Sequence, residues 1–375
     1  MMKTVNGVYT SAKIFTDTIE DYAMAQIQLL CDHEALKECR VRVMPDVHPG
    51  KVGTIGFTST IGGKILPNVV GIDIGCGLTI AKIKQRNLEF QRLDKVIREH
   101  IPSGFQIRKK PHRFSEAFEC SRIHCAKAVN QEKAYGSLGT LGGGNHFIEV
   151  AQGEDGTLYA AIHSGSRHLG KEVTEYYLKE GQKKLKARGI EVPYEWTYLE
   201  TGLMEKYLHD LEIVQAFAEL NRRAMLDELS KGMKWKIKEV YSLPHNYVDN
   251  SGSEPILRKG AVSAKAGEFV AIPMNMRDGI LLGEGLGNPE WNESAPHGSG
   301  RIMSRELVKN HHTVSQFKEE MKGIYCSCIG KETLDESPFA YRNMEEIVET
   351  VSDTVQIKER LRPVYNFKAG SKERG

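Results

Sequence analysis

Residues 69–83 read VVGIDIGCGLTIAKI, a largely apolar stretch interrupted by three glycines. Its second half, Leu78–Ile83, has the β-branched character of a short strand, and Lys64–Ile74 is predicted to form another. Asp73 and Cys76 lie inside this apolar stretch. Because an unpaired buried carboxylate is costly, Asp73 needs a partner or a metal ion. The stretch therefore predicts a strand-rich scaffold with metal-binding residue types beside its glycines.

Apolar runs separated by glycine clusters continue on both sides of this stretch. Further strands are predicted at Thr54–Phe57, Phe147–Ala151 and Leu158–Ile162. Amphipathic periodicity predicts helices at Leu88–Ile101, Thr201–Ser230, Ser304–Lys322 and about Asn343–Arg362. The apolar face of the longest helix is formed by Leu203, Tyr207, Leu211, Val214 and Ala218. The chain thus mixes strands and helices.

The composition is typical of a soluble globular protein. The chain has 375 residues, of which 40% are hydrophobic and 27% charged, with 51 basic and 49 acidic side chains. This balance excludes steering of a polyanion by net charge, so a nucleic-acid partner would contact local basic patches. No repeat or low-complexity linker divides the sequence, which predicts one domain over residues 1–375, with a mobile polar tail at 370–375.

The seven cysteines are irregularly spaced, which favours reduced thiols in a cytoplasmic protein over a disulfide framework. No signal-peptide pattern opens the chain, and no apolar run approaches the ~18 residues of a membrane span. We therefore expect no membrane partner. Cys326 and Cys328 form a CxC pattern without nearby histidines, and we interpret them, like Cys120 and Cys125, as packing or incidental thiols.

Three histidines stand beside the glycine clusters or at predicted strand ends. His146 follows three glycines, His163 ends a predicted strand, and His245 follows a proline. Each one alone is more often a structural residue than a ligand. Together with Asp73 and Cys76 they suit Zn²⁺, Mn²⁺ or Co²⁺, and would be enough for two ions if the thiolate bridges them. The spacing does not establish that they converge, because neither HExxH nor a paired CxxC is present.

The segment SAPHGSGRIMSR at 294–305 places His297 in a glycine turn followed by Arg301 and Arg305. If a helix begins here, the two arginines share one face of it. A helix N-terminus with adjacent arginines binds anions well. The segment is either a phosphate-binding turn with a histidine in reach or a purely structural turn.

Eight segments, taken together, resemble the RtcB family of RNA ligases. They appear in the family's order and cover most of the chain. They are MPDVHPGK at 44–51, VVGIDIGCG at 69–77, GTLGGGNHFIE at 139–149, IHSGSR at 162–167, HNYV at 245–248, RKGAVSAKAG at 258–267, GLGN at 285–288 and HGSGRIMSR at 297–305. The resemblance implies a single α+β domain with mixed β-sheets flanked by helices.

The resemblance also implies roles for particular residues. The family's ligands for two Mn²⁺ ions fall on Asp73, Cys76, His146, His163 and His245, with the thiolate as the bridge. His297 falls on the histidine that the family guanylylates, and Asp46 falls on the aspartate that orients its ring. A carboxylate on one imidazole nitrogen would leave the other as the nucleophile.

The family's GTP-binding positions also map onto this sequence. They are Asn145, His146, Phe147, Ile148, Glu149, Asn246, Pro273, Asn275, His297, Gly298, Ser299, Gly300, Tyr341 and Lys368. Among these, Glu149 could accept hydrogen bonds from guanine, which separates guanine from adenine. Arg167, Arg301 and Arg305 are expected to contact phosphate or the RNA backbone.

One segment departs from the family's pattern. Where members have a PGSMG turn followed by a second serine, this chain has Pro273–Arg277 and then Ile280. Asn275 can still donate a hydrogen bond, whereas Ile280 cannot, and Arg277 adds a charge. The change indicates a divergent branch in which nucleotide geometry or activity can differ.

The resemblance implies a GTP-dependent ligase that joins a 3′-phosphate or 2′,3′-cyclic phosphate RNA end to a 5′-hydroxyl end, in RNA repair or tRNA splicing. Two alternatives use the same residues differently. One is a binuclear metal phosphoesterase acting on cyclic phosphates. The other is a catalytically silent protein that binds RNA ends or guanine nucleotides. The RNA, the oligomeric state and any activating protein partner are left open.

Overall fold

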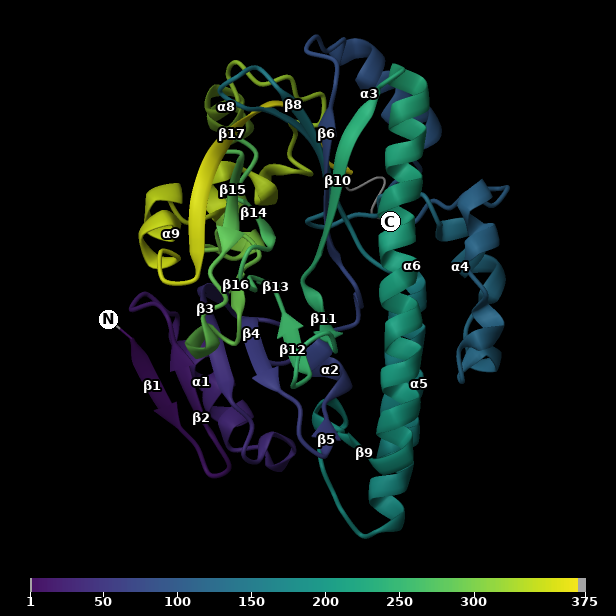
Figure 1. Ribbon diagram of the computed structural model, residues 1–375, viewed down its shortest axis with the longest axis vertical. Coiled ribbons are helices and arrows are strands. Elements are labelled where there is room, and N and C mark those ends of the chain that lie inside the picture. Colours follow the sequence, from purple (N-terminus) through teal and green to yellow (C-terminus); the bar gives the residue numbers. More distant parts are fainter. Residues whose placement is uncertain (1, 370–375) are drawn as a thin grey trace.

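The computed structural model describes residues 2–369, in which two β-sheets are flanked by helices (Figure 1). This confirms the mixed α+β fold implied by the family resemblance. The predicted tail at 370–375 lies outside the described residues. Among residues 2–369, no helix is long and apolar enough to cross a membrane.

The first sheet has six strands and is mixed, because β2 and β3 are parallel while its other neighbours are antiparallel. In sheet order the strands are β1 (Lys3–Asn6), β2 (Ser11–Ile14), β3 (Val41–His48), β4 (Ile55–Thr60), β12 (Ile256–Lys259) and β11 (Asn246–Asp249). Seven of the eight side chains of β3 are buried, which explains why this strand lies inside the sheet.

The second sheet has seven antiparallel strands. In order they are β10 (Ile237–Pro244), β6 (Gly77–Ile83), β8 (Leu158–Ser164), β7 (Phe147–Gln152), β17 (Val355–Phe367), β15 (Ile280–Gly285) and β14 (Phe269–Pro273). Two short pairs complete the strands: β13 (Ala261–Ser263) with β16 (Ser294–Pro296), and β5 (Lys64–Ile65) with β9 (Leu199–Glu200).

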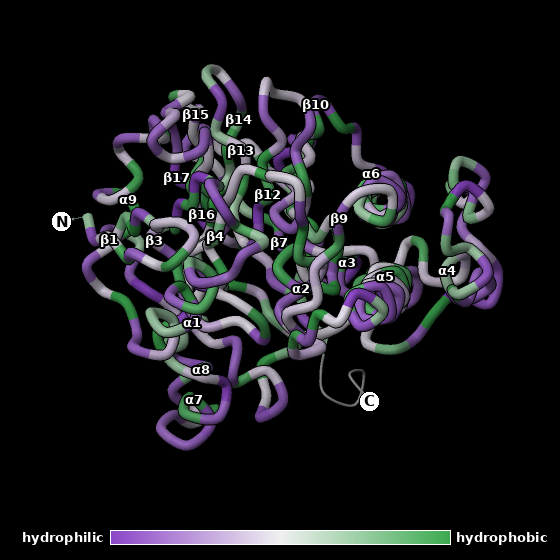
Figure 2. Tube along the Cα trace, turned by 90° about the horizontal axis from the view of Figure 1, so that it is seen from below, coloured by the Kyte–Doolittle hydropathy of each residue, from purple (hydrophilic) through white to green (hydrophobic). Residues whose placement is uncertain are grey.

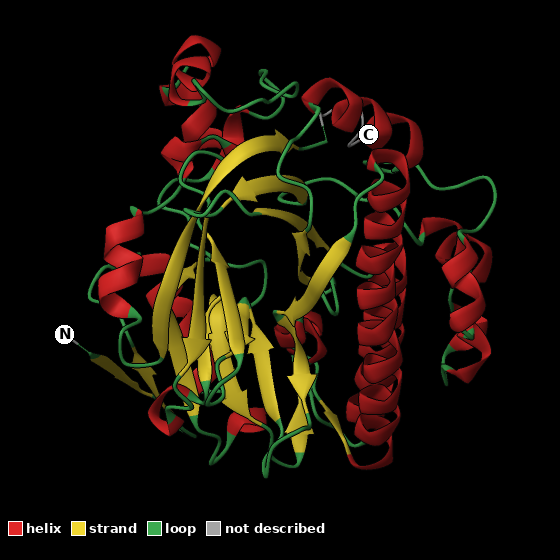
Figure 3. Cartoon of the chain, turned by 45° about the horizontal axis from the view of Figure 1, so that its top comes forward, coloured by secondary structure: helices red, strands yellow, loops and turns green. Residues whose placement is uncertain are grey.

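Two long helices, α5 (Arg167–Ala187) and α6 (Thr201–Met233), run beside the strands, and α4 (Gln131–Ser137) lies on their outer side (Figures 2 and 3). The predicted apolar face of α6 is buried throughout, as expected for an amphipathic helix that covers a sheet. The remaining helices are α1 (Asp21–Cys31), α2 (Pro67–Val70), α3 (Phe90–His100), α7 (Arg305–His311), α8 (Val314–Glu320) and α9 (Met344–Thr350).

The strand predicted at Lys64–Ile74 is wrong beyond its first two residues. After β5 the chain turns into α2, which has Pro67 at its first position. Proline suits this position because its missing N–H has no acceptor there and its φ is already helical. Gly71, with φ of +100°, then ends the helix.

The helix predicted at Asn343–Arg362 is also wrong in its second half. Only α9 is helical, and β17 follows it. β17 pairs with β15 on one side and β7 on the other, so tertiary sheet pairing overrides the helical periodicity. The segment Ser304–Lys322 forms two helices, because Thr313 and Gln316 make a capping box that starts α8. The sequence reading missed α5 altogether.

Candidate metal and nucleotide site

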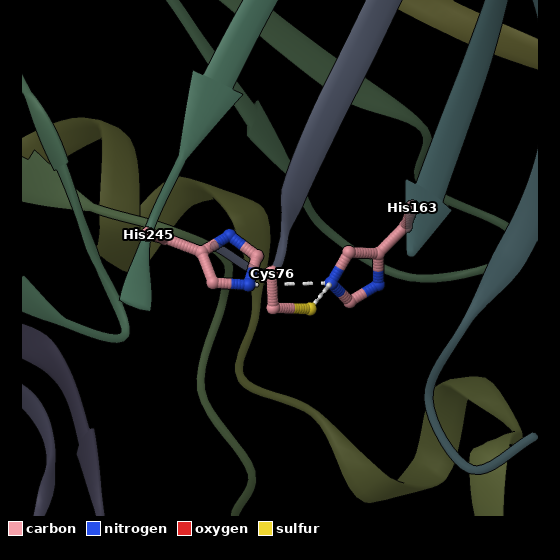
Figure 4. A group of neighbouring side chains, drawn as sticks. All are labelled: Cys76, His163 and His245. Carbon is pink, nitrogen blue, oxygen red and sulfur yellow. Dashed lines mark hydrogen bonds between the residues drawn. The ribbon is translucent and has the colours of Figure 1, made fainter. Parts of the chain in front are cut away.

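Cys76 lies at the centre of a group of side chains that can bind metal ions (Figure 4). It directly precedes β6, whereas His163 is near the end of β8 and His245 lies between β10 and β11. Because β6 pairs with both β8 and β10, the sheet brings the three side chains together. The Sγ of Cys76 is 3.4 Å from His163 Nε2, and that nitrogen is 3.3 Å from His245 Nε2.

Asp73 and His146 extend the group on another side of Cys76. The Nε2 of His146 is 3.1 Å from Asp73 Oδ2 and 3.5 Å from Cys76 Sγ. The other oxygen of Asp73 accepts the backbone N–H of Ser166 at 3.1 Å. A Cβ at Gly165 would lie 2.1 Å from this oxygen, so a glycine is required there for the carboxylate to keep its place.

Backbone carbonyls orient two of the imidazoles. The Nδ1 of His146 is 2.9 Å from Leu141 O, and the Nδ1 of His163 is 3.2 Å from Asn145 O. Since a carbonyl only accepts, each Nδ1 donates its proton to that carbonyl, so Nε2 is the nitrogen that each ring turns toward the group. Burial lowers the pKa of His163 and of His245 well below the usual value, which keeps both rings neutral.

The pKa values of the two acidic members of the group, Cys76 and Asp73, are shifted in opposite directions. Burial raises the pKa of the Cys76 thiol well above its usual value, and the neighbouring Asp73 raises it further. Desolvation alone would raise the pKa of Asp73 too, but the hydrogen bond and charge of His146 outweigh it, and the pKa falls to about 2. The group therefore offers a carboxylate, a thiol and the neutral imidazoles of His163 and His245.

These donors fit divalent cations of the borderline class. Two sets of ligand atoms, each within 4.8 Å of one another, share Cys76: one with His163 and His245, the other with Asp73 and His146. A bound cation would stabilise the thiolate that burial disfavours. The arrangement suits two neighbouring cations with the cysteine between them.

His297 lies next to this group, in the glycine turn that follows β16. Its Nδ1 donates to Asp46 Oδ2 at 2.7 Å, and its ring centroid is 4.7 Å from that of His245. Asp46 is fully buried in β3. Gly300 permits the close approach, because a Cβ there would lie 2.5 Å from the Asp46 carbonyl. With Nδ1 protonated, the Nε2 of His297 keeps a lone pair and can act as a nucleophile.

A pocket of about 890 Å³, open to solvent, adjoins His163, His245 and His297. Eleven of the fourteen predicted nucleotide-binding residues line it: Asn145, Phe147, Glu149, Pro273, Asn275, His297, Gly298, Ser299, Gly300, Tyr341 and Lys368.

Glu149 is one of two buried acids that line this pocket, with Glu336. Alternation along β7 turns Phe147 and Glu149 toward the pocket, and turns Ile148 into the core. The Oε1 of Glu149 has no hydrogen-bond partner within residues 2–369. Burial raises the pKa of Glu149 to about 8, although the charge of Lys368 opposes this. An unpartnered acceptor next to a cation is suited to a ligand with N–H donors.

The other three predicted nucleotide residues lie outside the lining. His146 belongs to the metal-binding group, and Ile148 is fully buried. The side chain of Asn246 forms a hydrogen bond with the backbone, in which its Oδ1 accepts the N–H of Gly260 at 3.0 Å.

The divergent segment forms a self-contained turn. The Oδ1 of Asn275 accepts the backbone N–H groups of Arg277 and Asp278, and its Nδ2 donates to Asp278 Oδ2 at 2.7 Å. The amide is therefore engaged within its own turn, although sequence reasoning kept it as a donor for a ligand. Arg277 forms ion pairs with Asp278 and Glu320, and Ile280 is fully buried in β15.

Arg301 and Arg305 line the pocket but are already paired. Arg305 forms ion pairs with the buried Asp335 and Glu336, and Arg301 donates to the Asp335 carbonyl at 2.7 Å. The condition under which the two arginines would share a helix face is not met, because Ser304 caps α7 and Arg301 lies before it. These arginines therefore hold buried carboxylates in place.

Arg167 lines a second pocket, of about 690 Å³. Its guanidinium donates to Thr140 Oγ1 and to the Gly104 carbonyl. Asp73 lines the same pocket, whereas His163 and His245 line the first. The metal-binding group therefore lies between two pockets.

Sequence reasoning missed three polar residues of the first pocket. His48 contacts the Asp46 carbonyl through Nδ1, and burial lowers its pKa to about 4. Asn366 donates to the Met276 carbonyl. Glu336 accepts hydrogen bonds from Lys368 Nζ at 3.0 Å and from the Tyr341 hydroxyl at 2.7 Å.

Comparison with known proteins agrees with the family that the sequence motifs indicated. The family model described as tRNA-splicing ligase RtcB matches residues 31–124 and 116–369. The RNA-splicing ligase RtcB1 of Escherichia coli ATCC 25922 is 33% identical over 370 residues, covering 88% of this chain and 90% of the relative. RNA-splicing ligase RtcB of E. coli K12 is 31% identical with the same coverage, and tRNA-splicing ligase RtcB of Aeropyrum pernix is 27% identical, covering 86% of each chain. The chain belongs to the RtcB family.

Proposed function

We propose that this protein is an RNA ligase that uses GTP and Mn²⁺ to join a 3′-phosphate or 2′,3′-cyclic phosphate end to a 5′-hydroxyl end. The observation that carries the proposal is the contact of His297 with Asp46 beside a group of five metal-binding residues. Residues from Asp46 to Lys368 contribute to this site, which supports one catalytic domain over the chain. Family membership supports the ligase class.

Asp73, Cys76, His146, His163 and His245 would hold the metal ions. Bound cations would neutralise phosphate charge and stabilise the leaving oxygens of in-line displacements. The protein's own contribution is to keep the imidazole lone pairs aimed at the site, through the carbonyls of Leu141 and Asn145.

His297 would act as the nucleophile on GTP. Its Nε2 attacks the α-phosphorus, the bond to the bridging oxygen breaks, and pyrophosphate leaves. Asp46 keeps Nδ1 protonated and stabilises the positive charge that develops on the ring. The 3′-phosphate of the RNA then displaces the histidine and takes up GMP, and the 5′-hydroxyl attacks the activated phosphate and releases GMP.

The pocket chemistry favours guanine. The unpartnered Oε1 of Glu149 can accept N–H donors of the kind that guanine, but not adenine, presents on its N1 and N2 edge. Lys368 Nζ lies 5.3 Å from the ring centroid of Phe147, and both side chains line the pocket, which therefore presents a cationic and an aromatic group to a ligand.

The experiment is incubation with radiolabelled GTP and Mn²⁺, followed by denaturing electrophoresis. The wild type should carry covalent GMP that acid removes, and His297→Ala should carry none. Joining of 3′-phosphate and 5′-hydroxyl RNA strands then tests the second half of the reaction. If the wild type forms no adduct, the ligase proposal fails, and hydrolysis of cyclic phosphates or simple end binding takes its place.

A further inference from the structure

Cys326 and Cys328 lie in a turn after α8, and their sulfur atoms are 3.2 Å apart. Both thiols are partly exposed, in contrast to the other five cysteines, which are buried. Neither residue lines either pocket. The sequence pattern alone indicated incidental thiols, but the turn places them in contact and within reach of solvent.

The two thiols are not equivalent. The Sγ of Cys328 accepts the backbone N–H of Lys368 at 3.3 Å. The hydrogen bond from Cys326 lowers the pKa of Cys328, and the Lys368 amide and the charges of Lys368 and Arg98 lower it further against the opposing effect of burial. The same contact raises the pKa of Cys326. When the pair loses one proton, the negative charge therefore lies on Cys328 rather than on Cys326, as in reactive dithiols.

The turn is bonded to the end of β17 (Val355–Phe367), and two pocket residues lie in and directly after this strand end. Tyr325 donates to the Val364 carbonyl at 3.0 Å, and the backbone N–H of Asn366 donates to the Tyr325 carbonyl at 2.9 Å. Asn366 and Lys368 both line the pocket. A change in the geometry of the turn is therefore transmitted through backbone hydrogen bonds to these two side chains.

We propose that Cys326 and Cys328 form a dithiol that hydrogen peroxide oxidises to a disulfide, and that this disulfide slows the reaction in the nucleotide pocket. The effect on the reaction rests on the proposed function. The formation of the disulfide does not.

The chemistry balances with hydrogen peroxide as the oxidant. The Cys328 thiolate attacks one peroxide oxygen, the O–O bond breaks, and a sulfenic acid forms as the departing hydroxide takes up a proton to give water. The Cys326 sulfur then attacks the Cys328 sulfur, and hydroxide leaves with the proton of Cys326 as a second water. A neutral disulfide sulfur is a weaker acceptor than a thiolate, so the Lys368 amide loses its partner.

The first readout is the mass of one peptide. The full chain is exposed to a pulse of hydrogen peroxide, unfolded in an alkylating agent and digested with trypsin. The peptide Gly323–Lys331 contains both cysteines and no other. We expect it to be recovered without alkyl groups, lighter by two hydrogen atoms, and alkylated twice after reduction. The doses of hydrogen peroxide are kept low enough to leave the buried Cys120 and Cys125 unoxidised. If the peptide then carries an alkyl group on both of its cysteines at every such dose, the proposal is overturned.

The second readout is the initial rate of GMP transfer to the protein, before oxidation, after it and after dithiothreitol. The wild type should slow by about ten-fold and recover on reduction. Cys328→Ser should keep its rate, because a serine oxygen can still accept the Lys368 N–H. Cys326→Ser should keep its rate because Cys326 lines neither pocket. Cys39→Ser is the matched control that should behave like wild type. A disulfide that forms with no change in rate would overturn the coupling. If the reduced protein formed no adduct, the proposed function would fail, while the peptide mass would still decide the dithiol.

Discussion

At the scale of single residues, the site depends on which nitrogen of His297 carries a proton. A carboxylate accepts only, so Asp46 fixes the proton on Nδ1. The second oxygen of Asp46 has no hydrogen-bond partner within the described chain, so the histidine is the main partner of this buried charge.

Replacing Asp46 by asparagine should therefore slow the transfer of GMP to His297 by on the order of 10³-fold, because an amide can stabilise the wrong tautomer and cannot stabilise an imidazolium. The rate of adduct formation with saturating GTP measures this. Asp155→Asn is the control, since that exposed carboxylate bonds only to Thr157. An Asp46→Asn protein with the wild-type rate would show that the contact is structural.

Glu149 gives the protein a pH-dependent stability. Its pKa rises from 4.5 in the unfolded chain to about 8 in the folded protein, so between these values the folded state binds more protons. The contribution of Glu149 to the unfolding free energy must then fall as the pH rises from about 5 to about 8, and it levels off above about pH 8. We expect the unfolding free energy of Glu149→Gln to lack this part of the slope, a difference of a few kcal/mol.

Urea unfolding of metal-free wild type and Glu149→Gln from pH 5 to 9 measures this difference. The comparison removes the contribution of other titrating groups, which the two proteins share. Parallel stability curves for the two proteins would contradict a raised pKa at Glu149.

At the scale of elements, α6 does more than cover the sheet. Its fully buried Arg222 donates to the carbonyls of Gly75 and Ser164 at 2.8 and 3.0 Å. These residues directly precede Cys76 and follow His163. The preceding Asn221 donates to Gly165 and accepts from Gly139 and Thr140. One turn of α6 therefore holds the loops that carry the metal-binding residues.

Replacing Arg222 by methionine should weaken Mn²⁺ binding by about ten- to a hundred-fold, because the carbonyls beside two ligands lose their donor. It should also lower the unfolding free energy by about 1–3 kcal/mol for each buried carbonyl left without a partner. Isothermal titration with Mn²⁺ and chemical unfolding measure the two effects. Arg223→Met is the matched control, because that neighbour is exposed and only approaches Glu219 at 3.8 Å. Equal Mn²⁺ affinity in the two variants would contradict this role.

At the scale of the whole molecule, the metal-binding group lies between two pockets, and only the first has nucleotide-binding features. The second is lined by Phe105, which is 69% exposed, by Ile72 and by the cationic Lys133, Arg167 and Lys171. Exposed aromatic and basic side chains together favour a nucleic-acid strand, since bases stack and phosphates pair.

Phe105→Ala should accordingly raise the KM for the RNA strands by about ten-fold, the loss of one stacked base, and leave GMP transfer unchanged. Steady-state ligation and adduct formation measure the two rates separately. Tyr22→Ala removes another exposed aromatic that lines neither pocket and should change neither rate. An unchanged KM in Phe105→Ala would exclude stacking at this position.

Local sequence patterns predicted part of this architecture well. The apolar face of α6 is buried as its periodicity indicated, and the strands near residues 55, 80, 150 and 160 were placed correctly. The second half of the predicted C-terminal helix is a strand, because β17 pairs on both sides with strands distant in sequence. Pairing of this kind leaves no local signal.

The sequence by itself determined the chemistry available to this protein: the residue types, the glycines that permit close approach, and the motifs that place it in its family. Only the tertiary structure decided which of these residues meet. Cys76 contacts histidines 70 and 87 residues away because β8 pairs with both β6 and β7. Arg301 and Arg305 hold buried acids because the segment around Glu336 packs against them. Contacts between distant segments depend on the packing of whole sheets and helices, so spacing along the chain does not encode them.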